Sequence, residues 1–253
     1  LGRWGQNLVN SVQGKSDKIR FVAGATRTVA KARDYAAQQG FPLYDDYAKV
    51  LGDPAIDAIV LATPHTQHAQ QVIAAAKARP GALNFGTINP GSGQNLSAEL
   101  FRTMAGIDVT IVPYKTTPDL ANAILRGDVD VAFEYFAGFQ SQITSNQMTV
   151  LATTGRERAG NTPQVPTVSE NGVPGYEVTS WNGLAVPKGT PREIVTTLNH
   201  AVVEALKSAP VQKFSQEAGM DARGMSPEDL HDRIRSDVAK WTQVIEKTGI
   251  QKR

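Results

Sequence analysis

The sequence predicts an α/β protein in which helices cover parallel sheets. Short apolar strands alternate with amphipathic helices along most of the 253 residues, and strands joined through helices form parallel sheets with right-handed crossovers. The run at 55–64, "AIDAIVLATP", is apolar through its middle, as expected of a central parallel strand covered on both faces. A chain of this length has room for one large core or two smaller ones.

The first part of the chain alternates helices and strands. Thr28 stands where a helix N-cap is expected, and Gly40 stands just past the end of the same helix. The predicted helices cover residues 5–14, 28–40, 47–54 and 68–78. The predicted strands cover residues 18–26, 42–46 and 55–64.

The second part has a different texture, with a glycine-rich loop at 90–93 that opens a helix ending near residue 106. The other predicted helices cover 118–127, 191–209 and 226–249, the last with Ser226 as its N-cap. The predicted strands cover 82–88, 108–114, 128–136 and 147–155. Residues 162–178 are rich in Pro and Gly, so we expect them to run over the surface.

The composition favours a small-molecule ligand. The chain carries 26 Lys and Arg against 24 Asp and Glu, a net charge of +2, with no long run of either sign. We therefore expect no nucleic-acid partner. The longest apolar runs are about ten residues, well short of the roughly twenty that cross a bilayer, so we expect no membrane insertion.

The absence of cysteine excludes disulfides, thiolate catalysis and cysteine-based metal sites. It fits either the cytosol or an oxidising compartment. The first residues lack both Met and the pattern of a secretory leader, so we expect a trimmed chain or a fragment.

Residues 1–78 carry the marks of a dinucleotide-binding unit. "LGRWG" opens a helix and fits the end of a G-x-G-x-x-G motif, with Gly2 and Gly5 as its second and third glycines. The next strand ends at "GATRT", where Arg27 replaces the usual acid and is suited to a 2′-phosphate. With "YDDYAKVLGDPAIDAIVLATPHTQHAQQVIAAAKA", this segment resembles the nucleotide-binding domain of the Gfo/Idh/MocA oxidoreductases, which implies NADP as an alternative cofactor. The simpler interpretation is that the two glycines only form a tight strand-to-helix turn.

The resemblance implies no catalysis, because the proton-transfer lysine of that family lies in a Glu-Lys-Pro motif that this sequence lacks. The protein is therefore expected to be a non-enzyme. His65 and His68 have a spacing that could face one metal ion, but no third ligand lies nearby in the sequence. We therefore expect no metal site and, in the main interpretation, no cofactor.

Residues 77–253 resemble the Bug or TctC receptors of tripartite tricarboxylate transporters. The runs that carry the resemblance are "AKARPGALNFGTINPGSGQNLSAELF", "MAGIDVTIVPYK", "LRGDVDVAFEYF", "LATTGRERAGNTPQVPTVSENGVPGYEVTSWNGLAVPKGTP", "IVTTLNHAVVEAL" and "SPEDLHDRIRSDVAKWTQVIEKTGI". The resemblance implies a two-lobed fold like the type II periplasmic binding proteins, with an N-terminal Rossmann-like sheet segment. It also implies a periplasmic receptor that captures a small carboxylate in an interlobe cleft for the membrane subunits of a transporter. A cytoplasmic location is the alternative.

The loop "NPGSGQN" is suited to a carboxylate, because glycines let backbone N–H groups converge at the start of a helix. Glu134 takes the place of the family's acid near the cleft, one methylene longer, and is equally explained as a surface acid at a strand end. Tyr114 and Trp181 leave the same alternatives open. The predicted ligand-binding residues are Thr87, Ser92, Gly93, Gln94, Asn95, Tyr114, Glu134 and Trp181.

The two resemblances meet in the helix at 68–78. We expect residues 1–82 and 184–253 to form a first lobe and residues 83–183 a second, ligand-binding lobe. A natural fusion, an engineered fusion and an error of sequence assembly all explain the join. A fused scaffold with neither activity is a third functional hypothesis.

Overall fold

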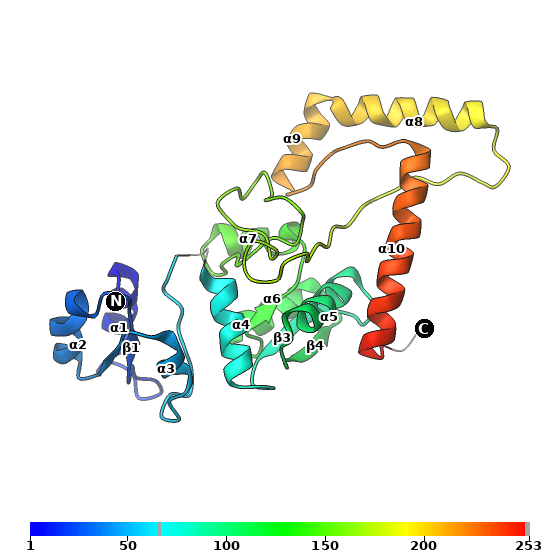
Figure 1. Ribbon diagram of the computed structural model, residues 1–253. Coiled ribbons are helices and arrows are strands. Elements are labelled where there is room, and N and C mark those ends of the chain that lie inside the picture. Colours follow the sequence, from blue (N-terminus) through cyan, green and yellow to red (C-terminus); the bar gives the residue numbers. More distant parts are fainter. Residues whose placement is uncertain (65–66, 251–253) are drawn as a thin grey trace. The chain divides into compact units, whose positions relative to one another are not determined.

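A computed structural model describes residues 1–64 and 67–250 and divides into two compact units, Leu1–Ala82 and Leu83–Arg253 (Figure 1). Within these described residues, no helix is both long and apolar enough to cross a membrane.

The first unit has a small parallel sheet, in which β1 (Gly24–Ala25) pairs with β2 (Leu43–Tyr44). Its core gathers around Val9, Ala36 and Phe41. Gly40 ends α2 in the left-handed conformation, φ 77°, which glycine adopts without steric cost. The helical elements are α1 (Arg3–Val12), the 3-10 helix η1 (Val29–Ala32), α2 (Arg33–Gln39), α3 (Tyr47–Leu51) and α4 (His68–Ala78).

The prediction of a central strand at 55–64 is wrong. The sheet of this unit holds β1 and β2, which pair with each other, and the described residues of the 55–64 run join no ladder. Val60, in the middle of the run, is 57 % exposed. A strand needs a neighbour whose N–H and C=O groups pair with its own, so an apolar run without one stays irregular.

The second unit is built on a parallel sheet of three strands in the order β4-β3-β5. These are β3 (Asn84–Ile88), β4 (Thr110–Tyr114) and β5 (Val131–Ala132). Gly86, in the central strand, lies opposite Val112 on one side and Ala132 on the other.

Helices α5 (Gly93–Ala105) and α6 (Thr117–Arg126) contact opposite faces of β3. Phe85 is fully buried and its ring lies 6.0 Å from that of Phe101 in α5. The next residue, Gly86, faces α6, because an added Cβ would stand 2.4 Å from Leu120 Cδ1. Alternation along β3 therefore places one helix on each face.

The predictions for residues 147–178 need two corrections. The expected strand at 147–155 is reduced to a single bridge between Thr153 and Thr167, because most of the run has no strand beside it. The Pro- and Gly-rich segment that follows runs over the surface only in part. Some of its apolar side chains belong to the core, with Val173 2 % exposed and Tyr176 1 % exposed.

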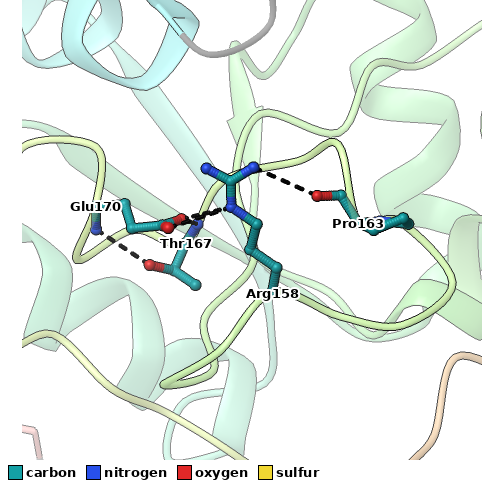
Figure 2. Close-up of polar contacts among 4 residues, drawn as sticks. All are labelled: Arg158, Pro163, Thr167 and Glu170. Atoms are coloured by element: carbon teal, nitrogen blue, oxygen red, sulfur yellow. Dashed lines mark hydrogen bonds and ion pairs between the residues drawn. The ribbon is translucent and has the colours of Figure 1, made fainter.

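Side-chain hydrogen bonds fix this irregular segment (Figure 2). Thr167 Oγ1 accepts from Glu170 N, while Glu170 Oε2 accepts from Thr167 N, the reciprocal pattern of a capping box. Arg158 Nε donates to the same carboxylate at 2.9 Å and its Nη1 to Pro163 O. The hydrogen bond from Thr167 N, with Arg158 beside it, lowers the pKa of the Glu170 carboxyl.

The C-terminal helices of the second unit are α7 (Phe136–Thr144), α8 (Arg192–Lys207), α9 (Ala209–Glu217) and α10 (Pro227–Thr248). Helix α10 contacts α5, and Lys240 Nζ donates to Glu177 O. Helix α8 is amphipathic but has no buried residue. The contacts thus group residues 184–253 with the second unit, whereas the sequence suggested grouping them with residues 1–82.

Candidate functional site

The loops at the carboxyl ends of β3 and β5 lie at a topological switch point. The chain leaves β3 through α5 to reach β4 on one side, and then crosses through α6 to β5 on the other side. In open parallel sheets, ligands bind in the crevice outside the carboxyl ends of the strands where the order reverses. A ligand is therefore expected beside the loop after β3 and the residues after β5.

The loop after β3 presents the start of α5. Ser92 is the N-cap, and its Oγ accepts from Asn95 N at 3.2 Å. Gly91 has φ 80°, a conformation that favours glycine and turns the chain into the helix. The N–H groups of Gly93 and Gln94 have no partner within the helix, because the first N–H groups of any helix lack one. This end of α5 can therefore donate to an anion.

Thr87 and Asn95 stabilise this loop through hydrogen bonds. Asn95 is 4 % exposed, and its Oδ1 accepts from Gly91 N while its Nδ2 donates to Thr87 Oγ1. Thr87 is fully buried and its hydroxyl donates to Ile88 O. Direct ligand contact by these two residues stays a prediction, since their polar atoms hold the loop in this structure.

Glu134 follows β5 and reaches the starts of two helices. Its Oε1 accepts from Gln94 Nε2 in α5 at 2.8 Å, and its Oε2 accepts from Thr117 Oγ1 in α6 at 2.9 Å. Oε1 also accepts from Tyr135 N at 2.8 Å. The structure therefore brings together two of the predicted site residues, Gln94 and Glu134, that are 40 positions apart in the sequence.

Three neighbours of this cluster are not among the residues predicted from the sequence. Thr117 bonds Glu134, and Tyr135 Oη lies 3.0 Å from the position of a Cβ added at Gly93. Gly138 makes room for the acid, because a Cβ added there would stand 3.1 Å from Glu134 Cγ. For Thr117, the sequence signal is its place directly before the predicted helix at 118–127, which follows the predicted strand at 108–114.

Tyr114 and Trp181 lie in other surroundings. Tyr114 is half-buried and packs against the apolar cluster of Leu120, Ala121 and Phe139. Trp181 Nε1 donates to Asp237 Oδ2 in α10, and its ring lines an open apolar groove with other α10 residues. A ligand role for either residue stays a prediction.

The predicted nucleotide-binding residues lie in the first unit. Gly2 is the N-cap of α1, and Gly5 is buried with room for a Cβ, since the nearest atom would stand 3.5 Å away. Arg27 is exposed just after β1. No group of three potential metal ligands occurs among the described residues; His65 lies outside them, and His68 is buried with Nε2 2.8 Å from Thr63 O.

Most of the chain matches one known family. Residues 47–250 match the family described as "Tripartite tricarboxylate transporter family receptor". The chain belongs to this receptor family. Residues 1–83 match "Oxidoreductase family, NAD-binding Rossmann fold", so the two matches overlap in residues 47–83.

A curated relative matches about two thirds of the chain. A "UPF0065 protein in tcbD-tcbE intergenic region" from Pseudomonas sp. (strain P51) is 30 % identical over 176 residues, which are 69 % of this chain and 52 % of that protein. The chain therefore spans about half the length of this relative.

Two solved structures resemble the chain in fold. "R. palustris Rpa4515 with adipate" has a TM-score of 0.64 and 26 % identity, covering 93 % of this chain and 99 % of that one. The periplasmic binding protein BugD has a TM-score of 0.60 and 25 % identity, covering 73 % and 62 %. The predicted fold class, an α/β periplasmic-binding-protein-like architecture with parallel sheets, is confirmed.

Proposed function

We propose that this receptor captures a small carboxylate at the start of α5. The observation that carries the proposal is the open helix start at the switch point of the sheet, in a chain that matches the receptor family over residues 47–250. A relative of the same fold was solved with adipate. Backbone N–H groups at a helix start bind carboxylates without a side-chain cation, which suits a receptor that must also release its ligand.

The same family membership supports the partners and the location. We infer that the receptor delivers its ligand to the membrane subunits of a tripartite tricarboxylate-type transporter, and that it works in the periplasm. We propose that the receptor carries out no chemical step, so that its ligand is released unchanged and no cofactor takes part.

Two substitutions at Gly93 test the site. Gly93→Pro removes the N–H of the first helical residue and keeps the helix, because proline is well tolerated at this position. Gly93→Ala keeps the N–H and adds a Cβ that meets Tyr135 Oη at the same 3.0 Å. We expect titration calorimetry with succinate, malate and adipate to show binding by the wild type, and about tenfold weaker binding by Gly93→Pro than by Gly93→Ala.

The outcome that contradicts the site is equal affinity of the two variants. Equal affinity would mean that the N–H of Gly93 does not contact the ligand. If the wild type gives no heat with any of the three acids, the proposed function itself is wrong.

A second candidate function is the binding of NADP by the first unit. The match of residues 1–83 to the Rossmann-fold family favours it, as does the exposure of Arg27 two residues after the end of a parallel strand. Calorimetry with NADPH tests this function. Arg27→Ala should weaken the binding of NADPH more than the binding of NADH, because only NADPH carries the 2′-phosphate. We propose that the first unit is a segment fused to the receptor. The intact mass and N-terminal sequence of the natural protein would show whether this segment belongs to it.

A further inference from the structure

The carboxylate of Glu134 lies beside the open start of α5, since its Oε1 accepts a hydrogen bond from Gln94 Nε2 at 2.8 Å. Gln94, which bonds Glu134 Oε1 through its side chain, also supplies one of the two open N–H groups. Tyr135, whose N–H bonds the same oxygen, places its hydroxyl against Gly93, which supplies the other. Glu134 is thus hydrogen-bonded to Gln94 and connected through Tyr135 to Gly93, the two residues that present the proposed anion site.

The contacts hold the carboxylate in one place. Donors reach it from α5, from α6 and from its own neighbour Tyr135, at distances of 2.8 to 2.9 Å. Close packing limits it further, since a Cβ added at Gly138 would stand 2.9 Å from Thr117 Cγ2 and 3.1 Å from Glu134 Cγ. A carboxylate fixed in this way presents a defined direction to a ligand.

The two oxygens of the carboxylate are not equally occupied. Each carboxylate oxygen accepts about two hydrogen bonds. Among the described residues, Oε1 accepts two, from Gln94 and Tyr135, whereas Oε2 accepts one, from Thr117. Oε2 can therefore accept a further hydrogen bond, and a ligand that bonds to it must bring a donor.

We propose that Glu134 is a specificity-determining residue that selects carboxylates carrying a hydrogen-bond donor, a hydroxyl or an ammonium group, beside the bound carboxylate. The inference rests on the proposed function. A ligand with such a donor pairs with Oε2. An unsubstituted acid places its own negative charge near Glu134 without that compensation, and a site built to bind an OH or NH group discriminates strongly against the analogue that lacks it.

Matched pairs of ligands test the proposal on the full chain. Succinate and malate differ by one hydroxyl, and adipate and 2-aminoadipate differ by one ammonium. We expect calorimetry to show that the wild type binds at least one donor-bearing acid about tenfold more tightly than its unsubstituted counterpart. Glu134→Gln should reduce that ratio to about twofold or less, because the charge and one acceptor oxygen are lost. The control Glu193→Gln, at an exposed acid in α8, should leave the ratio unchanged.

The outcomes separate this inference from the function on which it rests. If no acid binds to the wild type, the proposed function is wrong and the inference falls with it. If acids bind but neither pair shows a preference for the donor, the inference alone is wrong, whether or not Glu134→Gln folds. If the preference exists and a folded Glu134→Gln keeps it, Glu134 is not its cause.

Discussion

Tyr176 connects the irregular segment after residue 153 to helix α5. Its hydroxyl lies 2.6 Å from Ser97 Oγ and also donates to Ser97 O at 3.0 Å. Its ring packs edge-on against Phe101 at 6.0 Å, and the residue is 1 % exposed. Burial raises the pKa of Tyr176 well above its ordinary value, because the phenolate would have to form away from water.

This raised pKa predicts alkaline instability. The unfolded chain releases the Tyr176 proton near pH 10, while the folded chain retains it. The unfolded state then binds fewer protons, so the free energy of unfolding falls as the pH rises above about 10. Urea denaturation followed by circular dichroism between pH 7 and 11 should show this fall, and Tyr176→Phe should make it shallower.

The same variant separates ionisation from hydrogen bonding. At pH 7 the free energy of unfolding of Tyr176→Phe should be about 1 to 2 kcal/mol lower than that of the wild type, because Ser97 loses its buried hydrogen-bond partner. Equal slopes above pH 10 for the wild type and the variant would show that Tyr176 does not titrate on unfolding.

Single residues of the site differ in how well the sequence predicted them. The glycine-rich loop that opens a helix follows from a local pattern, and α5 begins there, with Ser92 as its N-cap. The pairing of Gln94 with Glu134, and of Glu134 with Thr117, joins residues 40 and 17 positions apart. Such pairings depend on strand order, which no local pattern contains.

At the level of elements, helices were predicted better than strands. Helices carry their own hydrogen bonds and their own end signals, so α4, α5, α6 and α10 lie close to their predicted ranges. The runs at 55–64 and 147–155 have strand composition but lack a partner ladder. A strand depends on residues elsewhere in the chain, and composition alone does not supply them.

The contact between β3 and α6 predicts the effect of one added methyl group. In Gly86→Ala the new Cβ would stand 2.4 Å from Leu120 Cδ1 and 2.9 Å from Val129 Cγ1, and Leu120 is fully buried. Overpacking of this kind costs about 1 to 3 kcal/mol. Urea denaturation should show a lower midpoint for Gly86→Ala.

Gly160→Ala is the matched control, because an added Cβ would meet nothing within 4 Å there. It should change the free energy of unfolding by no more than about 0.5 kcal/mol. Equal stability of the two variants would mean that β3 and α6 can separate without cost.

At the level of the whole molecule, the region that matches the receptor family and the second compact unit begin at different residues. The receptor match begins at residue 47, whereas the second compact unit begins at Leu83. The sheet and helix starts that form the candidate site all lie in that second unit. The site can therefore be tested without assuming any arrangement of the two units.

Ligand-dependent hydrogen exchange on the full chain tells the two candidate functions apart. A ligand at 100 times its Kd stabilises the folded protein to which it binds by about 2.7 kcal/mol. With saturating carboxylate, we expect slower amide exchange in the start of α5 and in residues 133–138. With NADPH, slower exchange should appear instead in α1 and after β1, where Gly2 and Arg27 lie. Protection by NADPH alone would reverse the order of the two functions, because it would place the ligand in the first unit.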